Sequence, residues 1–416
     1  MAEFVLIAGI GLSIALWLQP EPHSDWGYYW AAAGQVSAYE RGGAGLWLLA
    51  IPKALGWSPV SSALLLNLAS VVVLLVLMRR IDISNGKYLS LLLAFYLLLI
   101  APFFGIVQLD LIATTLVASG MVAVMAAPKG LAQSLSIAMA VILIAAGVST
   151  KPQYALICWT MAGLFILPAF FLRRRKVSNE IVSRILILTL FAGATLGFAF
   201  DSSLRELGGR SEAIRTNSAV TLYGGLLTSS DGVGCGAWSL EASKAARQDL
   251  SKPPHEAILG RLKEKPFGHW ASVVRCKLPS IFHPPPFALY WLVESPNVRA
   301  RINVSPQKAS IEEAYSRALR FERKIYSLVT LAIMLSVVGT TFLLWRKGSP
   351  RLGLLGLLWV LSFWFVHAVF EIQGRYFLGM YMLSIVICAL AIHHDLHKDK
   401  EAQNRSALNG DPPESN

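Results

Sequence analysis

Long apolar runs alternate with short polar connections along most of this chain. A helix that crosses the hydrocarbon core of a bilayer needs roughly 20 predominantly apolar residues. The ranges that meet or approach this length are 3–19, 60–78, 88–106, 109–127, 131–149, 153–172, 182–200, 325–345, 352–370 and 376–393. The pattern therefore predicts an all-α, polytopic transmembrane helix bundle with about ten spans.

Two longer polar regions interrupt this pattern. Residues 20–59 contain several Trp and Tyr side chains, then glycines and an apolar patch, which predicts two short amphipathic helices in the outer membrane interface. Residues 201–324 are expected to form a mostly helical subdomain outside the membrane. The predicted division is therefore spans one to seven in 1–200, this loop subdomain, spans eight to ten in 325–393, and a disordered cytoplasmic tail in 394–416.

Basic residues occupy alternate short connections between the apolar runs. They are Arg79, Arg80, Lys87, Lys129, Arg173, Arg174, Arg175, Lys176, Arg346, Lys347, Arg351, Lys398, Lys400 and Arg405. Short loops rich in Lys and Arg remain on the cytoplasmic side of a membrane. We therefore expect both termini to be cytoplasmic and the two longer polar regions to lie outside.

The composition fits a membrane protein and disfavours a nucleic-acid-binding one. The chain has 416 residues, of which 55% are hydrophobic and 15% charged, whereas a soluble domain carries about 25% charged residues. Its mean hydropathy is +0.53. The formal net charge of +12 would suggest nucleic acid in a soluble protein, but no basic stripe with aromatics forms a reading surface. Membrane lipids and phosphorylated substrates are the expected partners.

Five ionisable residues interrupt the apolar runs at their predicted outer ends: Asp25, Asp110, Lys151, Glu371 and Arg375. Ionised groups at membrane depth are costly and usually functional. Their shared side predicts a catalytic or binding cavity at the outer surface. The sequence contains no phosphate-binding loop, dinucleotide fingerprint, nucleophile elbow or zinc motif that would suggest another chemistry.

The two aspartates each allow two interpretations. Asp25 can accept a proton from an acceptor hydroxyl or bind a divalent cation. Alternatively, Ser24 or Asp25 caps the helix that follows. Asp110 is either a second acid at the same depth or a cap for the span that it begins.

The remaining candidates also have structural alternatives. Lys151, with Gln153 beside it, either joins the acids or snorkels to the interface. Arg375 suits phosphate because its planar fork donates two parallel hydrogen bonds, and Glu371 either holds it or forms a plain ion pair with it. His283 either faces the cavity or packs.

Two of the four cysteines, Cys235 and Cys276, lie in the predicted outer subdomain. In an oxidising compartment they could form a disulfide. Two cysteines without a recognised spacing could equally remain free thiols.

These residues together resemble the C-type superfamily of integral-membrane glycosyltransferases. The similarity is greatest to the bacterial branch with protein mannosyltransferases and the lipid A aminoarabinose transferase. It rests on Asp25 after the first span, on Asp110, on Lys151-Pro152-Gln153, and on Glu371 with Arg375-Tyr376 at the last hairpin. The large outer loop after span seven also fits. One departure is that many members carry two adjacent acids after the first span, whereas Trp26 follows Asp25 here.

The resemblance implies transfer of a sugar from a polyprenyl-phosphate donor in the bacterial inner membrane. The acceptor would be a hydroxyl of a lipid, glycan or protein, activated by Asp25 as base, and the anomeric carbon would be inverted. The resemblance assigns Asp110 to catalysis and leaves open a divalent cation as cofactor. Together with the residue-by-residue interpretation above, the expected substrate-binding residues are Lys151, Gln153, His283, Glu371, Arg375 and Tyr376.

Three other functions compete with this interpretation. A transporter or flippase of a lipid-linked or anionic substrate would place charges near the midplane on broken helices, often with internal repeats. Here the charges lie at the outer ends and no repeat is evident. An O-antigen ligase or polymerase usually has its outer loop later in the chain. A non-catalytic scaffold would explain the interfacial aromatics but not the acids and bases.

Overall fold

The computed structural model describes residues 2–35, 39–81, 87–125, 131–171, 177–208, 219–226, 236 and 239–409. Within these ranges the chain is helical and has no strand. Each predicted apolar run corresponds to a helix. These are α1 (Ala2–Leu18), α4 (Pro59–Arg80), α5 (Lys87–Leu99), α6 (Asp110–Met125), α7 (Leu131–Thr150), α8 (Gln153–Phe171), α9 (Val177–Leu207), α16 (Lys308–Arg346), α17 (Pro350–Val369) and α18 (Phe377–Asn409).

Among the described residues, six helical segments are long and apolar enough to cross a membrane. They lie in α4, α7, α9, α16, α17 and the 3-10 turn η3 (Gly374–Tyr376) with α18. The apolar parts of α1, α5, α6 and α8 are shorter. Length and composition thus indicate a multi-pass membrane protein with an all-α fold.

Both predicted outer regions contain helices. Residues 20–59 form α2 (Ser24–Ala32) and α3 (Gly43–Ala54), and Gly42 precedes α3 with a φ of +106°, a conformation that suits glycine. The second region contains a helical stretch at 219–226, followed by α11 (Leu240–Gln248), α12 (Pro254–Lys263), α13 (Phe267–Phe282), α14 (Ala288–Val293) and α15 (Pro296–Val304).

Several predicted boundaries are wrong for identifiable reasons. The run 88–106 is not one helix, because Pro102 lacks an N–H and the chain forms the 3-10 turn η2 (Ala101–Gly105) after α5. The predicted loop 201–324 is shorter at both ends. Helix α9 continues to Leu207 and helix α16 already begins at Lys308, because the polar residues there remain in the helical hydrogen-bond pattern.

The predicted tail begins within helix α18. Helix α18 continues to Asn409, and 394–409 contains no Gly or Pro that would end it. Residues 410–416 of that predicted tail lie outside the described residues.

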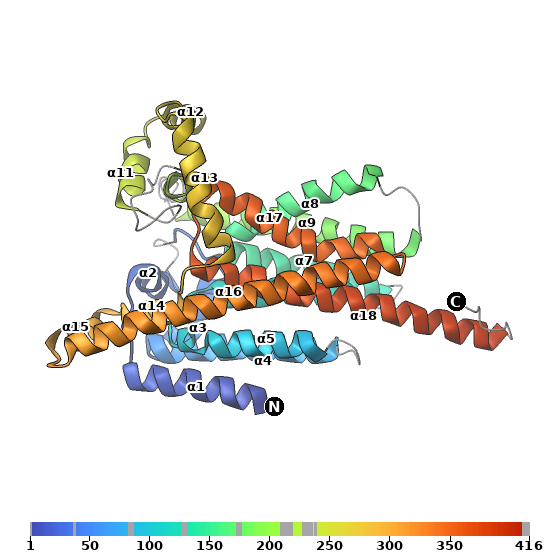
Figure 1. Cartoon of the computed structure of the whole chain (residues 1–416), viewed down its shortest axis with the longest axis horizontal. Helices are drawn as coiled ribbons and strands as arrows, with labels where there is room; N and C mark the ends of the chain where they lie inside the picture. Colours follow the sequence, from blue (N-terminus) through green and yellow to red (C-terminus); the bar gives the residue numbers. More distant parts are fainter. Residues whose placement is uncertain are drawn as a thin grey trace.

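Helix α18 lies in the centre of the bundle. Of the 18 most apolar consecutive residues in its apolar segment, 94% are buried, against 22% of the corresponding residues in α7. Helix α18 packs on α6, α16 and α17. The start of α1 and the end of α18 both point away from the end that carries α2 and α14 (Figure 1). Because the helices alternate in direction, the beginnings of α6 and α18 and the end of α7 meet at that other end.

Candidate functional site

A hydrogen-bonded network of charged side chains forms where α2, α6 and η3 meet. Arg375 donates from Nη2 to Asp25 Oδ2 and from Nη1 to Gln108 Oε1, each at 2.5 Å. Arg41, in the connection between α2 and α3, donates to Asp25 Oδ1, also at 2.5 Å. One carboxylate therefore lies between two guanidinium groups, one on the first outer connection and one on the last hairpin.

Asp110 and Lys151 form a second pair in the same region. Lys151 Nζ lies 2.9 Å from Asp110 Oδ2, and the two side chains are only 8% and 2% exposed. Lys151 Nζ is also 5.8 Å from the centre of the Tyr29 ring on α2. Lys151 is therefore buried among site residues, so it does not snorkel to the membrane surface.

Neither aspartate caps its helix with its side chain. The N-cap of α2 is His23, which makes no side-chain cap hydrogen bond, and the Asp25 carboxylate turns to the two arginines instead. The oxygens of Asp110 accept no hydrogen bond from the described residues. The Lys151 ammonium lies beside them and forms an ion pair with Oδ2. The capping alternatives are therefore wrong, and both acids point into the network.

The network gives two carboxyls opposite proton affinities. Burial alone would raise the pKa of Asp25, but the charges of Arg375, Arg41 and Lys151 together hold it well below its usual range. Burial raises the pKa of Glu371, and its neighbouring charges do not overcome this. Asp25 is therefore firmly anionic, whereas Glu371 has a stronger tendency to hold a proton.

Glu371 does not pair with Arg375 in the way that the sequence allowed. Its Oε1 accepts hydrogen bonds from the Tyr376 hydroxyl at 2.6 Å and from Gln373 Nε2 at 2.7 Å. Its Oε2 has no hydrogen-bond partner among the described residues. The Tyr376 ring stacks on His367 at 5.3 Å. The guanidinium carbon of Arg375 lies 5.5 Å from the centre of the Tyr376 ring, so the Glu371–Tyr376 pair packs beside Arg375.

An aromatic residue from the predicted outer subdomain reaches this network. The ring of Trp291 on α14 lies 5.1 Å from the guanidinium carbon of Arg375 and 5.4 Å from the ring of His23. A guanidinium over an aromatic face is a favourable contact. The region 201–324 therefore contributes directly to the surroundings of Arg375.

A buried lysine anchors the hairpin that carries Glu371 and Arg375. Lys277 on α13 donates to the carbonyls of Gly225 at 3.1 Å, Ala368 at 2.9 Å and Phe370 at 2.8 Å. Gly374 lets the hairpin approach the subdomain closely, because a Cβ at this position would lie only 2.0 Å from the Pro285 carbonyl oxygen and would clash with it. The subdomain and the hairpin are thus locked together around the site.

The other predicted site residues lie at or beyond the edge. Gln153 is half-buried at the start of α8, two residues after Lys151. His283 is exposed, and its ring is hydrogen-bonded to the Ser327 hydroxyl on α16 at 2.7 Å. The structure therefore does not bring His283 to the network, because its ring is directed to Ser327 instead.

The predicted cysteine pair is described only at one of its two members. Cys276 is disulfide-bonded, and Cys235 lies outside the described residues. Cys158 and Cys388 are free and buried, as expected of packing residues in apolar helices.

Sequence reasoning missed Arg41, Lys277 and Trp291. Arg41 carried a usable signal, because it is a basic residue on the side predicted to be outside, like Lys151. Lys277 and Trp291 carried none, since only the folded subdomain brings them to the hairpin.

The acids as arranged do not fit a divalent cation. Both oxygens of Asp25 accept from guanidinium groups, and Asp110 faces an ammonium. Within the described ranges, no group of three or more His, Cys, Asp or Glu side chains could hold a metal ion. The site is instead rich in cations, which suits an anionic ligand.

Comparison with protein-family models, with characterised proteins and with solved structures gives no match. Function therefore has to follow from the chemistry of the site itself.

Proposed function

We propose that this protein is an integral-membrane glycosyltransferase that moves a sugar from a polyprenyl-phosphate donor to an acceptor hydroxyl at the outer membrane face. The observation that carries the proposal is the network itself. An anionic Asp25 contacts Arg41 and Arg375, with Lys151 close by, at one end of a bundle of apolar helices. In this proposal all ten apolar helices cross the bacterial inner membrane and both termini are cytoplasmic.

The three cations suit the leaving group of such a transfer. A sugar-phosphate diester carries one negative charge, and the lipid phosphate that departs gains a second one as the glycosidic bond breaks. Preorganised donors aimed at a developing charge are usually the largest catalytic contribution. The guanidinium of Arg375 provides a planar fork for phosphate oxygens, and Lys151 and Arg41 provide further positive charge.

The ion pair of Asp25 with Arg375 links donor binding to base strength. While Arg375 donates to Asp25, the low pKa of this carboxylate makes it a weak base. A donor phosphate competes for Arg375, and loss of that cation raises the proton affinity of Asp25. Asp25 therefore becomes an effective base only when the donor phosphate is bound. Deprotonation of an acceptor hydroxyl in the absence of the donor is thereby limited.

The step then proceeds as a single displacement. The acceptor oxygen attacks the anomeric carbon while its proton passes to the Asp25 carboxylate. The bond from the anomeric carbon to the phosphate oxygen breaks, its electron pair stays on that oxygen, and the configuration inverts. Such a step needs no nucleophilic side chain. Asp110 holds Lys151 in place, and Glu371 with Tyr376 packs beside Arg375.

The test is transfer from a panel of polyprenyl-phosphate sugars by the purified full chain in nanodiscs. We expect Asp25→Asn and Arg375→Ala each to reduce transfer by about 100-fold or more, since a positioned base alone contributes that much. Arg317→Ala is the matched control, because this arginine is 60% exposed and pairs with Glu313 away from the site. Thermal unfolding of each variant checks folding.

Two outcomes would overturn the proposal. One is transfer at the normal rate by folded Asp25→Asn. The other is no transfer or donor hydrolysis with any sugar, together with movement of lipid-linked substrate across liposomes, which would identify a transporter or flippase instead.

A further inference from the structure

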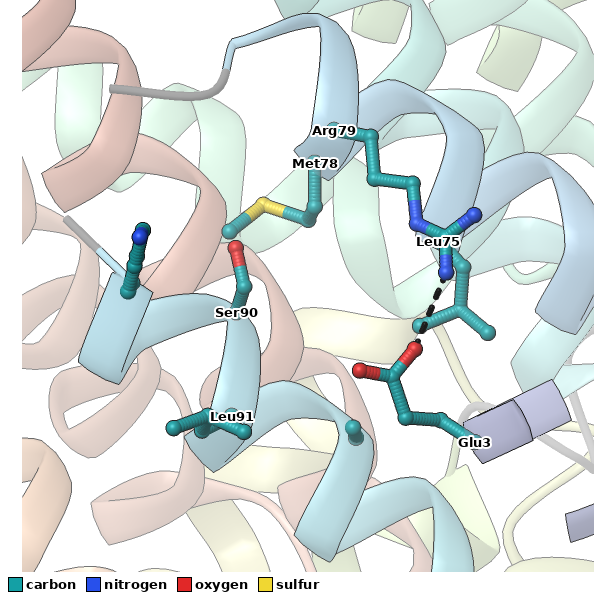
Figure 2. Close-up of a pocket in the computed structure, with 8 residues that line it drawn as sticks. Glu3, Leu75, Met78, Arg79, Ser90 and Leu91 are labelled. Atoms are coloured by element: carbon teal, nitrogen blue, oxygen red, sulfur yellow. Dashed lines mark hydrogen bonds and ion pairs between the residues drawn. The ribbon is translucent and has the colours of Figure 1, made fainter. Parts of the chain in front are cut away.

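A pocket lies at the end of the bundle opposite the network, between α1, α4 and α5 (Figure 2). Its volume is about 260 Å³. The residues that line it are Glu3, Leu75, Met78, Arg79, Lys87, Ser90, Leu91 and Ala94. None of them belongs to the network around Asp25.

The lining combines two kinds of surface. Arg79, Lys87 and Ser90 supply two cations and a hydroxyl, all of which can donate to phosphate oxygens. Leu75 and Leu91 supply apolar walls, and Leu91 is exposed. A charged head over an apolar wall matches the two parts of a phospholipid, whereas a free anion would use only one of them.

The carboxylate now on Arg79 is a weak competitor. Glu3 Oε2 accepts from Arg79 Nη2 at 3.0 Å, and the two side chains are 47% and 53% exposed; Figure 2 shows them facing each other. An exposed ion pair of this kind contributes little to stability. A phosphate held by Lys87 as well can therefore displace Glu3 or share the guanidinium with it.

We propose that this pocket binds the phosphate headgroup of an anionic glycerophospholipid, with an acyl chain along Leu75 and Leu91. The basic connections of the chain lie on this side, which the charge rule makes cytoplasmic. The cytoplasmic leaflet of a membrane is rich in anionic lipids. The lipid joins α1 to α4 and α5, and it is independent of the proposed sugar transfer.

The experiment compares lipids that stay bound to the full chain when it is released from nanodiscs, read by native mass spectrometry. The nanodiscs contain phosphatidylcholine with phosphatidylglycerol. We expect wild type to retain phosphatidylglycerol and the double variant Arg79→Gln/Lys87→Gln to retain roughly tenfold less, because each basic contact at a membrane surface adds several-fold to affinity.

The matched control is Arg80→Gln. It removes the same charge at the next residue, which does not line the pocket, and it should retain lipid like wild type. The single variant Arg79→Gln should lose part of the lipid; an equal loss in Arg80→Gln would overturn the proposal in favour of a general charge effect. Glu3→Gln removes the competitor and should increase retention; a decrease would overturn the proposal even if the double variant failed to fold.

Inorganic phosphate separates a lipid site from a plain anion site. It cannot use the apolar wall, so we expect it to leave the bound phosphatidylglycerol in place. Displacement of the lipid by inorganic phosphate at modest concentration would overturn the assignment to a lipid.

Discussion

Two buried lysines near the site show how differently one side chain can be used. Lys277 and Lys151 are 3% and 6% exposed. Lys277 directs hydrogen bonds to three main-chain carbonyls, which matches its three donors. Lys151 faces one carboxylate, Asp110, whose oxygens accept no hydrogen bond among the described residues. A buried cation with all donors used holds the chain together, whereas one with unused capacity is available to a ligand.

The largest effect is expected from Lys277→Met. This change leaves three inward-facing carbonyls without their donor, and each costs about 1–3 kcal/mol. We expect the free energy of unfolding to fall by roughly 4 kcal/mol or more. The measurement is denaturant unfolding in detergent.

Lys263→Met is the control for Lys277, since Lys263 is exposed on α12 and a surface change should stay within about 0.5 kcal/mol. A stability loss at Lys277 no larger than at Lys263 would remove the distinction between the two buried lysines.

A double-mutant cycle sharpens the other side of the comparison. Lys151→Met leaves Asp110 as an unpaired buried charge, so it should cost about 3 kcal/mol of stability. Lys151→Met/Asp110→Asn removes both charges and should recover most of that stability, because no buried ion is left. Sugar transfer should remain lost in the double variant. Recovery of both stability and transfer would mean that the pair serves folding only.

A smaller and pH-dependent effect is expected at Glu371. Because its folded-state pKa is raised, its contribution to stability is fully present below the unfolded pKa, roughly 4.3, and is lost as pH rises through the folded-state pKa. Glu371→Gln keeps an acceptor for Tyr376 and is neutral at every pH. It should therefore be more stable than wild type at neutral pH.

The gain in Glu371→Gln should disappear in acid, where the carboxyl of the wild type is protonated as well. Unfolding curves of both proteins across this pH range provide the check. A gain of equal size at all pH values would show that packing, not charge, explains it.

Sequence alone predicted the helices and the end of the bundle where the charges gather. The apolar runs identified the helices because lipid-facing segments need continuous hydrophobicity, and their alternation of direction placed Asp25, Asp110 and Arg375 at one end. The sequence could not predict which charged side chains form ion pairs with one another. Asp25 bonds to Arg41, 16 residues away, and to Arg375, 350 residues away.

The errors have a common origin in tertiary structure and local chemistry. Pro102 ended a helix within an apolar run, and His283 left the site because it bonds to Ser327. Lys277 and Trp291 became important only because the subdomain folds back on the last hairpin. Patterns of hydrophobicity report the environment of a helix, but they do not report which loop returns to cover its end.

The central position of α18 has a consequence for how the protein is made. This helix follows every helix that surrounds it in the chain, so the ribosome delivers the core of the bundle after its periphery. Until then the earlier helices enclose a space that only α18 can fill, and Asp25 lacks Arg375. A nascent chain is therefore incompletely packed and also lacks the Asp25–Arg375 ion pair, so packing and assembly of the network would depend on the same late insertion.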